Sequence, residues 1–220
     1  MILDLGLVDY EESYTLQKEL VGKVRSGQIE DSVIIAEHRA VFTIGRTGKK
    51  ENLLTGEEAL RDANIKFLNV DRGGDITFHG PGQIVLYPII DLKNRGRDLH
   101  RYLRDLEEIV MGFLKDYGVS GDRVKGRTGV WVGDKKIAFI GIAATDWVTY
   151  HGLSVNINVD LKYFSMIRPC GLEDVEIVSL NEILNRDVDM AEAKERLLHH
   201  FSGIFRVGET DYAKDFSLVA

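Results

Sequence analysis

Residues 72–83 read Arg72-Gly73-Gly74-Asp75-Ile76-Thr77-Phe78-His79-Gly80-Pro81-Gly82-Gln83. Four glycines and a proline surround a short strand-like run, which has Arg72 and His79 near its two ends. Glycine lets a backbone turn sharply or approach a ligand closely. The stretch has neither the Gly-Lys-Ser/Thr of a P-loop nor a G-x-G-x-x-G that opens a helix. Tight turns alone would explain the glycines, but the added arginine and histidine favour a substrate pocket.

Apolar periodicity outward from this stretch predicts strands and helices in mixed order. Alternating or continuous apolar runs predict strands at 33–36, 41–44, 83–90 and 155–159, and a hairpin of 129–132 with 136–140 across Gly133-Asp134. Apolar residues spaced three and four apart predict helices at 10–25, 99–117 and 190–201. Asp9, Asp98 and Asp189 would cap their N-termini. Glu12 and Glu192, three residues after the first and last of these caps, would complete capping pairs. We therefore expect an α+β fold whose mixed or largely antiparallel sheet is flanked by helices.

Composition predicts a single globular domain over residues 1–220. Of the 220 residues, 44% are hydrophobic and 29% are charged, which supports a real core and a soluble surface. The net charge of -7 argues against a nucleic-acid binder. Two basic stretches would still steer an acidic protein partner, although a solvated surface explains each of them as well. They comprise Lys93, Arg95, Arg97, Arg101 and Arg104, and then Arg123, Lys125, Arg127, Lys135 and Lys136.

Cysteine usage and targeting features indicate a reducing compartment. Cys170 is the single cysteine, so no internal disulfide forms and a multi-cysteine zinc site is excluded. The first residues lack a basic region followed by a long apolar run, and no segment has the 18–20 apolar residues that a membrane span needs. We expect a cytoplasmic protein with no nucleic-acid and no membrane partner.

Three further segments hold candidate functional residues, and each has an ordinary structural explanation. Lysines 135 and 136 lie in the predicted hairpin, where they would simply make a turn soluble. His151 precedes Gly152-Leu153-Ser154, and such a histidine is more often structural. Cys170 lies between Pro169 and Gly171, at a chain turn rather than in a periodic core run. Because loops carry reactive groups more often than core runs do, this cysteine is a candidate nucleophile.

Taken together, the segments resemble the lipoyl (octanoyl) transferases, which share a fold with the biotin- and lipoate-protein ligases. The resemblance covers roughly residues 33–180, and the His-Gly-Pro-Gly-Gln and Pro-Cys-Gly elements together make it specific. The matching stretches are residues 72–83, Gly129-Val130-Trp131-Val132, Lys136-Ile137-Ala138, His151-Gly152-Leu153 and Pro169-Cys170-Gly171. The sequence departs from the family's usual pattern at three places. Phe139 stands where a small residue is usual, residues 143–146 where a basic stretch is usual, and Ile44 where a polar residue is usual.

The resemblance implies an acyltransferase that acts in protein lipoylation without a cofactor or a metal. An octanoyl group would pass from octanoyl-acyl carrier protein to the enzyme cysteine as a thioester. It would then pass to a lysine of an apo lipoyl domain, in a 2-oxoacid dehydrogenase subunit or the glycine-cleavage H protein. Cys170 matches the nucleophile and Lys136 the lysine paired with it. The matching substrate-binding residues are Arg72, Gly73, Gly74, Asp75, Ile76, Thr77, Phe78, His79, Phe139, Ile140, Gly141, Gly152, Leu153 and Ser154.

The chemistry of a thiol agrees with this assignment. A free thiol is only a few per cent thiolate at neutral pH, and a nearby ammonium favours the thiolate. Lys136 would supply that ammonium and move a proton between the leaving thiol and the incoming amine. Strand alternation does not decide between Lys135 and Lys136; the family match selects Lys136. Backbone N–H groups near Gly73, Gly74 or Gly141 would stabilise the oxyanion, and Ile76, Phe78 and Phe139 would line the acyl channel.

Other functions remain possible at the level of sequence. An ATP-dependent lipoate- or biotin-protein ligase on the same fold would form an acyl-adenylate and need no cysteine. An amidotransferase would move octanoyl groups between lipoyl domains. A lipoyl-domain binder would need no catalysis, and a Cys-His hydrolase would use His79 or His151 as its base.

Overall fold

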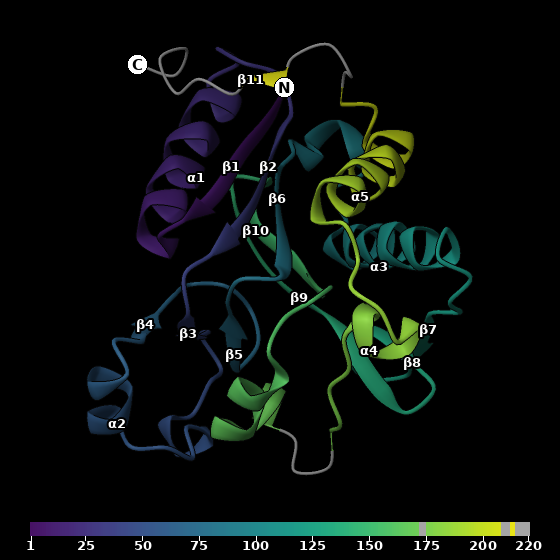
Figure 1. Cartoon of the computed structure of the whole chain (residues 1–220). Helices are drawn as coiled ribbons and strands as arrows, with labels where there is room; N and C mark the ends of the chain where they lie inside the picture. The colour runs from purple at the N-terminus through teal and green to yellow at the C-terminus, as the bar shows by residue number, and fades with distance from the viewer. Residues whose placement is uncertain (172–174, 208–211, 214–220) are drawn as a thin grey trace.

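The computed structural model describes residues 1–171, 175–207 and 212–213, and in these ranges it has two sheets with helices packed around them (Figure 1). The larger sheet has eight strands in the order β11-β1-β2-β6-β10-β9-β8-β7, and the smaller has the order β4-β3-β5. The strands are β1 (Ile2–Val8), β2 (Ser32–His38), β3 (Val41–Ile44), β4 (Lys66–Asn69), β5 (Ile76–His79), β6 (Gln83–Ile89), β7 (Asp122–Val124), β8 (Arg127–Val132), β9 (Lys135–Thr145), β10 (Val148–Asn156) and β11 (Tyr212–Ala213).

Both sheets are mixed, as the sequence predicts. Strand β1 runs parallel to β2 and β11, whereas the remaining neighbours in the large sheet are antiparallel. In the small sheet β3 is parallel to β4 and antiparallel to β5. The hairpin of β8 and β9 is confirmed. The strand predicted at 155–159 is wrong in its bounds, because β10 begins at Val148 and ends at Asn156.

Strand alternation divides the large sheet between two hydrophobic cores. In β6, Ile84 and Leu86 face the core that α3 (Leu99–Lys115) and α5 (Met190–Phe205) cover. Val85 and Tyr87 face the opposite core, which α1 (Tyr10–Arg25) covers. This is the period of two that a strand buried on both faces requires. The α+β class with a helix-flanked mixed sheet is thus confirmed.

The predicted helices form, but their caps differ. Asp98 accepts hydrogen bonds from the backbone N–H groups of His100 and Arg101, and Asp189 does the same for Ala191 and Glu192. Asp9 makes no capping bond to α1, because its carboxylate pairs with Arg39 and Lys66 instead. Two short helices were not predicted, α2 (Glu57–Asp62) and α4 (Leu180–Leu184). No helix within the described ranges is long and apolar enough to cross a membrane.

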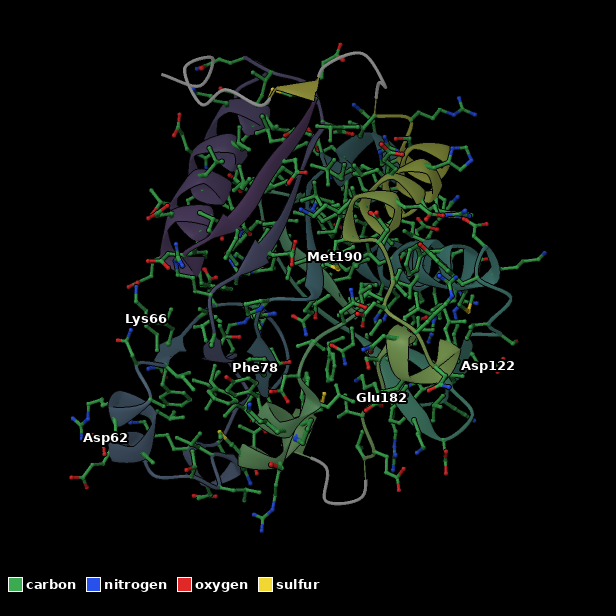
Figure 2. The ribbon with its side chains drawn as sticks, in the orientation of Figure 1. Asp62, Lys66, Phe78, Asp122, Glu182 and Met190 are labelled. Atoms are coloured by element: carbon green, nitrogen blue, oxygen red, sulfur yellow. The ribbon has the colours of Figure 1, made fainter. Side chains whose placement is uncertain are left out.

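The small sheet has an aromatic core of its own. The ring of Phe78 in β5 lies 5.1 Å from that of Phe42 in β3, centroid to centroid, and 5.7 Å from that of Phe164. Phe164 comes from a 3-10 helix, Leu161–Met166, that follows β10 in the chain. Figure 2 shows Phe78 toward the middle of the molecule, with Asp62 and Lys66 nearer its edge. This core supports one side of the site described below.

Two buried histidines lie where the sheets meet. His38 Nδ1 lies 3.1 Å from the Val8 carbonyl oxygen, and His38 Nε2 lies 2.7 Å from the Tyr87 hydroxyl. His79 Nδ1 lies 2.7 Å from Gln83 Oε1, so this nitrogen carries the proton. Burial lowers the pKa of His38 to about 4 and the pKa of His79 to about 3, so both imidazoles are neutral at pH 7.

We expect the free energy of unfolding to fall on acidification already between pH 7 and pH 5, before most carboxylates titrate. An unfolded histidine titrates near pH 6.5, above the folded pKa values of about 4 and about 3 for His38 and His79. Between these pH values the unfolded chain binds more protons than the folded chain. The contribution of the two neutral imidazoles to the free energy of unfolding is therefore complete above pH 6.5 and is lost as the pH falls toward 4. Each imidazole contributes a slope of up to about 1.4 kcal/mol per pH unit. Urea unfolding at pH 7, 6 and 5 measures the slope.

The variant His79→Gln isolates the contribution of one imidazole. Glutamine does not titrate, so the free energy of unfolding should fall less steeply with pH in this variant. A free energy of unfolding that stays constant from pH 7 to pH 5 in the wild type would contradict the prediction.

Candidate active site

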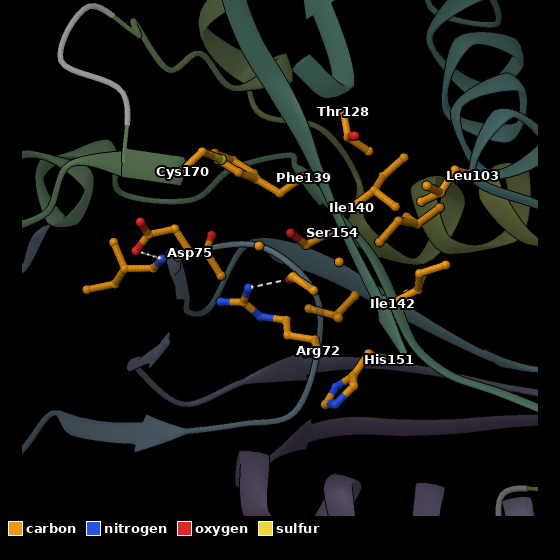
Figure 3. Close-up of a pocket in the computed structure, with 18 of the residues that line it drawn as sticks. Arg72, Asp75, Leu103, Thr128, Phe139, Ile140, Ile142, His151, Ser154 and Cys170 are labelled. Carbon is orange, nitrogen blue, oxygen red and sulfur yellow. Dashed lines mark hydrogen bonds between the residues drawn. The ribbon is translucent and has the colours of Figure 1, made fainter. Parts of the chain in front are cut away.

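A cavity of about 560 Å³ opens between the two sheets. Its lining comes from β5, from the facing strands β9 and β10, and from the turns that hold Gly73, Gly126 and Cys170. Figure 3 shows Cys170 beside Phe139 at one end of the lining and His151 at the other, with Arg72 between them. A cavity of this volume, apolar for the most part and with a few polar groups, is typical of small-molecule sites.

Cys170 lies in a turn whose backbone is strained. Its φ of 59° and ψ of 17° place it in the left-handed region, which non-glycine residues adopt at an energetic cost. The next residue, Gly171, has a φ of +69°, and a Cβ there would lie 2.7 Å from Asp75 Oδ2. Only glycine fits this position, because it combines a left-handed backbone with close packing against a carboxylate.

Asp75 holds the cysteine turn in place. Its Oδ2 accepts a hydrogen bond of 2.6 Å from Asn52 Nδ2, and the Asn52 carbonyl accepts one of 2.7 Å from the Arg168 N–H. The other oxygen, Oδ1, accepts from the N–H groups of Ile76 and Lys49. The predicted substrate-binding residue Asp75 therefore lines the cavity and also links the start of β5 to the turn that carries Cys170.

Lys136 points its ammonium at the sulfur of Cys170. Its Nζ donates to Cys170 Sγ at 3.3 Å and to the Thr128 carbonyl at 2.8 Å, and the residue is only 2% exposed. Lys135 is exposed and pairs with Glu176 instead, so Lys136 is the one of the two lysines that contacts Cys170. Because Lys136 is buried, it does not contribute to the second basic stretch, which the sequence suggested as a surface for an acidic partner.

The backbone around Lys136 leaves space for its side chain. Gly129, on the neighbouring strand β8, has a φ of +123°, and a Cβ there would lie 2.7 Å from Lys136 Cε and 2.5 Å from the Ala138 carbonyl oxygen. On its other side, Lys136 donates its N–H to the Glu176 carbonyl and accepts from the Val178 N–H. The lysine is thus fixed by β8 and by the segment that follows the cysteine turn.

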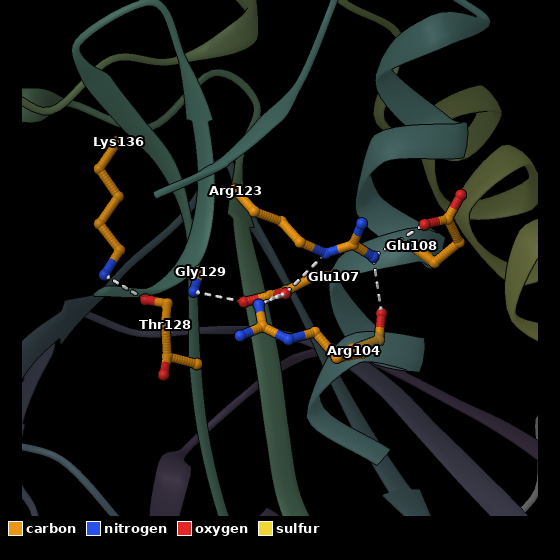
Figure 4. A network of polar contacts seen from close by, with 7 residues as sticks. All are labelled: Arg104, Glu107, Glu108, Arg123, Thr128, Gly129 and Lys136. Carbon is orange, nitrogen blue, oxygen red and sulfur yellow. Dashed lines mark hydrogen bonds and ion pairs between the residues drawn. The ribbon is translucent and has the colours of Figure 1, made fainter. Parts of the chain in front are cut away.

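A buried carboxylate on α3 supports β8 from behind. Glu107 is 1% exposed and accepts hydrogen bonds from Arg104 at 2.6 Å and from Arg123 at 2.9 Å (Figure 4). It also accepts one of 3.3 Å from the Gly129 N–H. Gly129 follows Thr128, so this network fixes the carbonyl that receives the Lys136 ammonium.

Arg72 packs along the middle of the cavity. It is 8% exposed, and its guanidinium donates to the Gly73 carbonyl and to both the carbonyl and the hydroxyl of Thr43. Among the described residues, its Nε, the Thr77 hydroxyl and the Ser154 hydroxyl have no hydrogen-bond partner. The N–H of Gly73 donates to the Ile142 carbonyl, so it is not available to an oxyanion.

The far end of the cavity contains a polar network that the sequence did not reveal. His151 Nε2 donates to Asp71 Oδ1 at 2.7 Å, and its Nδ1 lies 3.3 Å from the Tyr10 hydroxyl. Asp71 also accepts hydrogen bonds from Tyr150 and Lys18, and these groups keep the pKa of its carboxyl low against the opposing effect of burial. Tyr10 belongs to α1, whereas Asp71 directly precedes the Gly-rich stretch of residues 72–83, so only the folded chain brings them together.

The structure places nearly every predicted site residue on the cavity. Cys170 and Lys136 line it together with Arg72, Gly73, Gly74, Asp75, Ile76, Thr77, His79, Phe139, Ile140, Gly141, Gly152, Leu153 and Ser154. Phe78 is the exception, and its prediction as a lining residue is wrong. Because β5 pairs with β3 in the register Phe42↔Phe78, the Phe78 ring enters the aromatic core, where it stacks 4.5 Å from Tyr163.

The variant Gly129→Ala tests the packing around Lys136. The added Cβ should displace the ammonium and slow alkylation of Cys170 by iodoacetamide by about three- to tenfold, because the ammonium favours the thiolate. Gly133→Ala is the control: its φ of +62° is also left-handed, so alanine is strained there too, but its Cβ would meet nothing within 4 Å. Equal alkylation rates in the two variants would contradict the role of Gly129.

Comparisons with known proteins agree with the resemblance that the motifs indicated. The family model described as the lipoyl protein ligase A/B catalytic domain matches residues 9–202. A curated protein of Syntrophotalea carbinolica named octanoyltransferase is 43% identical over 205 residues, which cover 93% of this chain and 94% of the relative. One of Rubrobacter xylanophilus with the same name is 46% identical over 198 residues, covering 89% of each chain.

Solved structures share the fold at much lower sequence identity. A lipoate-protein ligase A bound with ATP superimposes with a TM-score of 0.77 at 17% identity, over 97% of this chain and 87% of the ligase. Likeness at this identity concerns the fold alone, whereas the family match and the curated relatives extend over most of the sequence. The chain therefore belongs to the lipoyl protein ligase A/B catalytic-domain family.

Proposed function

We propose that the protein transfers an octanoyl group from a carrier-bound thioester, through Cys170, to a lysine of an apo lipoyl domain. The 3.3 Å contact between Lys136 Nζ and Cys170 Sγ, at one end of a cavity of about 560 Å³, is the observation that carries this proposal. The curated relatives named octanoyltransferase support the acyl group and the reaction class.

In the first half-reaction the Cys170 thiolate attacks the carbonyl carbon of the donor thioester. The new C–S bond forms and the bond to the donor sulfur breaks, so the donor leaves with the electron pair. The Lys136 ammonium gives the departing sulfur a proton. The products are a donor thiol, an acyl-enzyme thioester and a neutral Lys136.

In the second half-reaction the neutral amine of the acceptor lysine attacks the acyl-enzyme. An amide bond forms, Cys170 leaves as the thiolate, and Lys136 takes the proton that the amine gives up. The enzyme returns to its starting state with ammonium beside thiolate. Because thioester exchange is nearly balanced and the amide is the more stable product, the cycle needs no ATP.

The cavity suits an acyl chain that extends away from Cys170. Ile76, Phe139 and Leu153 provide apolar lining, and the chain would run between β5 and the facing strands β9 and β10. Gly74 and Gly141 remain the candidate oxyanion donors after Gly73 is excluded. We assign the whole chain, residues 1–220, to one catalytic unit.

The partners follow from the same reaction. The donor would be octanoyl-acyl carrier protein, and the acceptor an apo lipoyl domain of a 2-oxoacid dehydrogenase subunit or of the glycine-cleavage H protein. Exposed cations lie on or next in sequence to the cavity lining: Arg127 lines the cavity, Lys125 precedes the lining residue Gly126, and Arg46 precedes the lining residue Thr47. They would steer an acidic partner toward Cys170, although the chain as a whole is acidic.

The alternatives have less support. An adenylating ligase has no need of a thiol held against an ammonium. A Cys-His hydrolase needs an imidazole on the sulfur, but within the described residues the hydrogen bonds of His79 and His151 go to Gln83, Asp71 and Tyr10 rather than to Cys170.

Mixing the protein with octanoyl-acyl carrier protein, without ATP, should add one octanoyl group that intact-mass spectrometry detects. The adduct should be absent from Cys170→Ser, removable by hydroxylamine and transferable to an apo lipoyl domain. A carrier that its own synthetase can acylate is the positive control. No adduct under these conditions would favour the adenylating ligase or a binding role.

Lys136→Met should slow the formation of this adduct and leave the fold intact. Methionine keeps most of the apolar stem but removes both the charge and the transferable proton, and a positioned proton donor contributes about 10²- to 10⁴-fold to rate. Single-turnover acylation measures the effect, with circular dichroism as the folding control and Lys135→Met as the matched variant. Acylation as fast in Lys136→Met as in Lys135→Met would exclude the role of Lys136.

A further inference from the structure

We infer that Trp131 and Phe139 form an aromatic cradle that positions the Lys136 ammonium on Cys170, and that Phe139 is a positioning residue for the reaction. The Lys136 Nζ lies 4.9 Å from the centroid of the Phe139 ring and 5.4 Å from that of the Trp131 ring. Both distances are within the range of about 6 Å in which a cation is attracted to the face of an aromatic ring. The inference rests on the proposed roles of Cys170 and Lys136.

The burial of Lys136 is the reason that a cradle is needed. Lys136 is only 2% exposed, and removing a charge from solvent costs free energy unless the charge is paired or hydrogen-bonded. Its hydrogen bonds go to the Thr128 carbonyl and the Cys170 sulfur, and no carboxylate lies within 4.0 Å of its Nζ in the part of the chain that is described. The two ring faces provide the remaining compensation.

Aromatic rings suit this task better than a carboxylate would. A carboxylate beside Lys136 would take up its N–H groups and offset the positive charge that the thiolate needs. A ring face stabilises the cation through its quadrupole and does not compete as a strong proton acceptor. The cradle therefore attracts the ammonium while its N–H groups stay directed at the sulfur and at the Thr128 carbonyl.

The position of Phe139 is itself well fixed. Its ring stacks on that of Phe164 with centroids 5.3 Å apart and planes inclined by 5°, and the residue is 6% exposed. Its backbone lies in β9, opposite Ser154 of β10. Phe139 borders the cavity beside Cys170, so the same ring touches both the ammonium and the space for the acyl group (Figure 3).

Stepwise fluorination of Phe139 tests the inference. Phenylalanine with one, two or three ring fluorines keeps nearly the same shape while the electron density on its face falls, which weakens its attraction for a cation. The rate constant for alkylation by iodoacetamide at pH 7 reports Cys170 alone, because the chain has one cysteine. We expect this rate to fall with each added fluorine, by about two- to tenfold in total.

Phe164 is the matched control. It stacks on Phe139 in the same aromatic core, and no cation–ring contact involves it among the described residues. Fluorination at Phe164 should leave the alkylation rate unchanged. A flat series at Phe139, or the same decline at Phe164, would overturn the inference, since a purely structural role predicts no dependence on ring electrons.

Measuring the alkylation rate of Cys170 also tests the aromatic cradle independently of the proposed function. Alkylation needs neither a donor nor an acceptor, so a graded series at Phe139 supports the cradle even if octanoyl transfer is not found. If transfer is found and the cradle is correct, the single-turnover acylation rate should fall in the same order as the alkylation rate.

Discussion

The partly buried contact between the Lys136 ammonium and the Cys170 sulfur is the constraint around which this site is built. A lysine and a thiol held 3.3 Å apart form a reactive pair only if neither side chain can swing away. The lysine is held by β8 on one side and by the segment that follows the cysteine turn on the other. The cysteine is held by a turn that Asp75 and Asn52 secure. The strain at Cys170 persists because these contacts together over-determine it.

Strand β9 connects this contact to the rest of the molecule. Ile137 and Ala138 belong to the core beneath α3 and α5, and Phe139 belongs to the aromatic core of the small sheet. Ala143, further along the strand, belongs to the core beneath α1. One strand therefore contributes to each of the three hydrophobic clusters. Lys136 lies at the start of β9, so the packing of the whole protein fixes its backbone.

The parts of the fold that local sequence determines could be predicted, and those that depend on distant pairing could not. Helix α1 was predicted with its observed bounds from its apolar spacing, but Asp9 was assigned a capping role because its ion pairs with Arg39 and Lys66 depend on the tertiary fold. Strand β1 has seven residues but was missed, because Asp4 and Gly6 interrupt its apolar run, its register shifts between Asp4 and Leu7, and it pairs in parallel with β2.

The same distinction applies to the site. Cys170, Lys136 and the Gly-rich stretch carry motifs that identify them, whereas Tyr10 and Asp71 lie outside the matching stretches and come close to the site through packing. Trp131 lies in a matching stretch, but its place beside the Lys136 ammonium is visible only in the fold. Phe78 was misassigned because strand alternation alone does not say which side chains of β5 meet the cavity; its ring packs against Phe42 and Tyr163 in the aromatic core.

The two backbone hydrogen bonds of Lys136, donated to the Glu176 carbonyl and accepted from the Val178 N–H, have a consequence for local unfolding. They join the strand that carries the lysine to the chain segment just beyond the cysteine turn. An opening that detached this segment would remove support from both reactive groups in one cooperative event, rather than loosening them one at a time. Amide hydrogen exchange in this part of the chain would then measure how often the protein visits a state without its reactive pair.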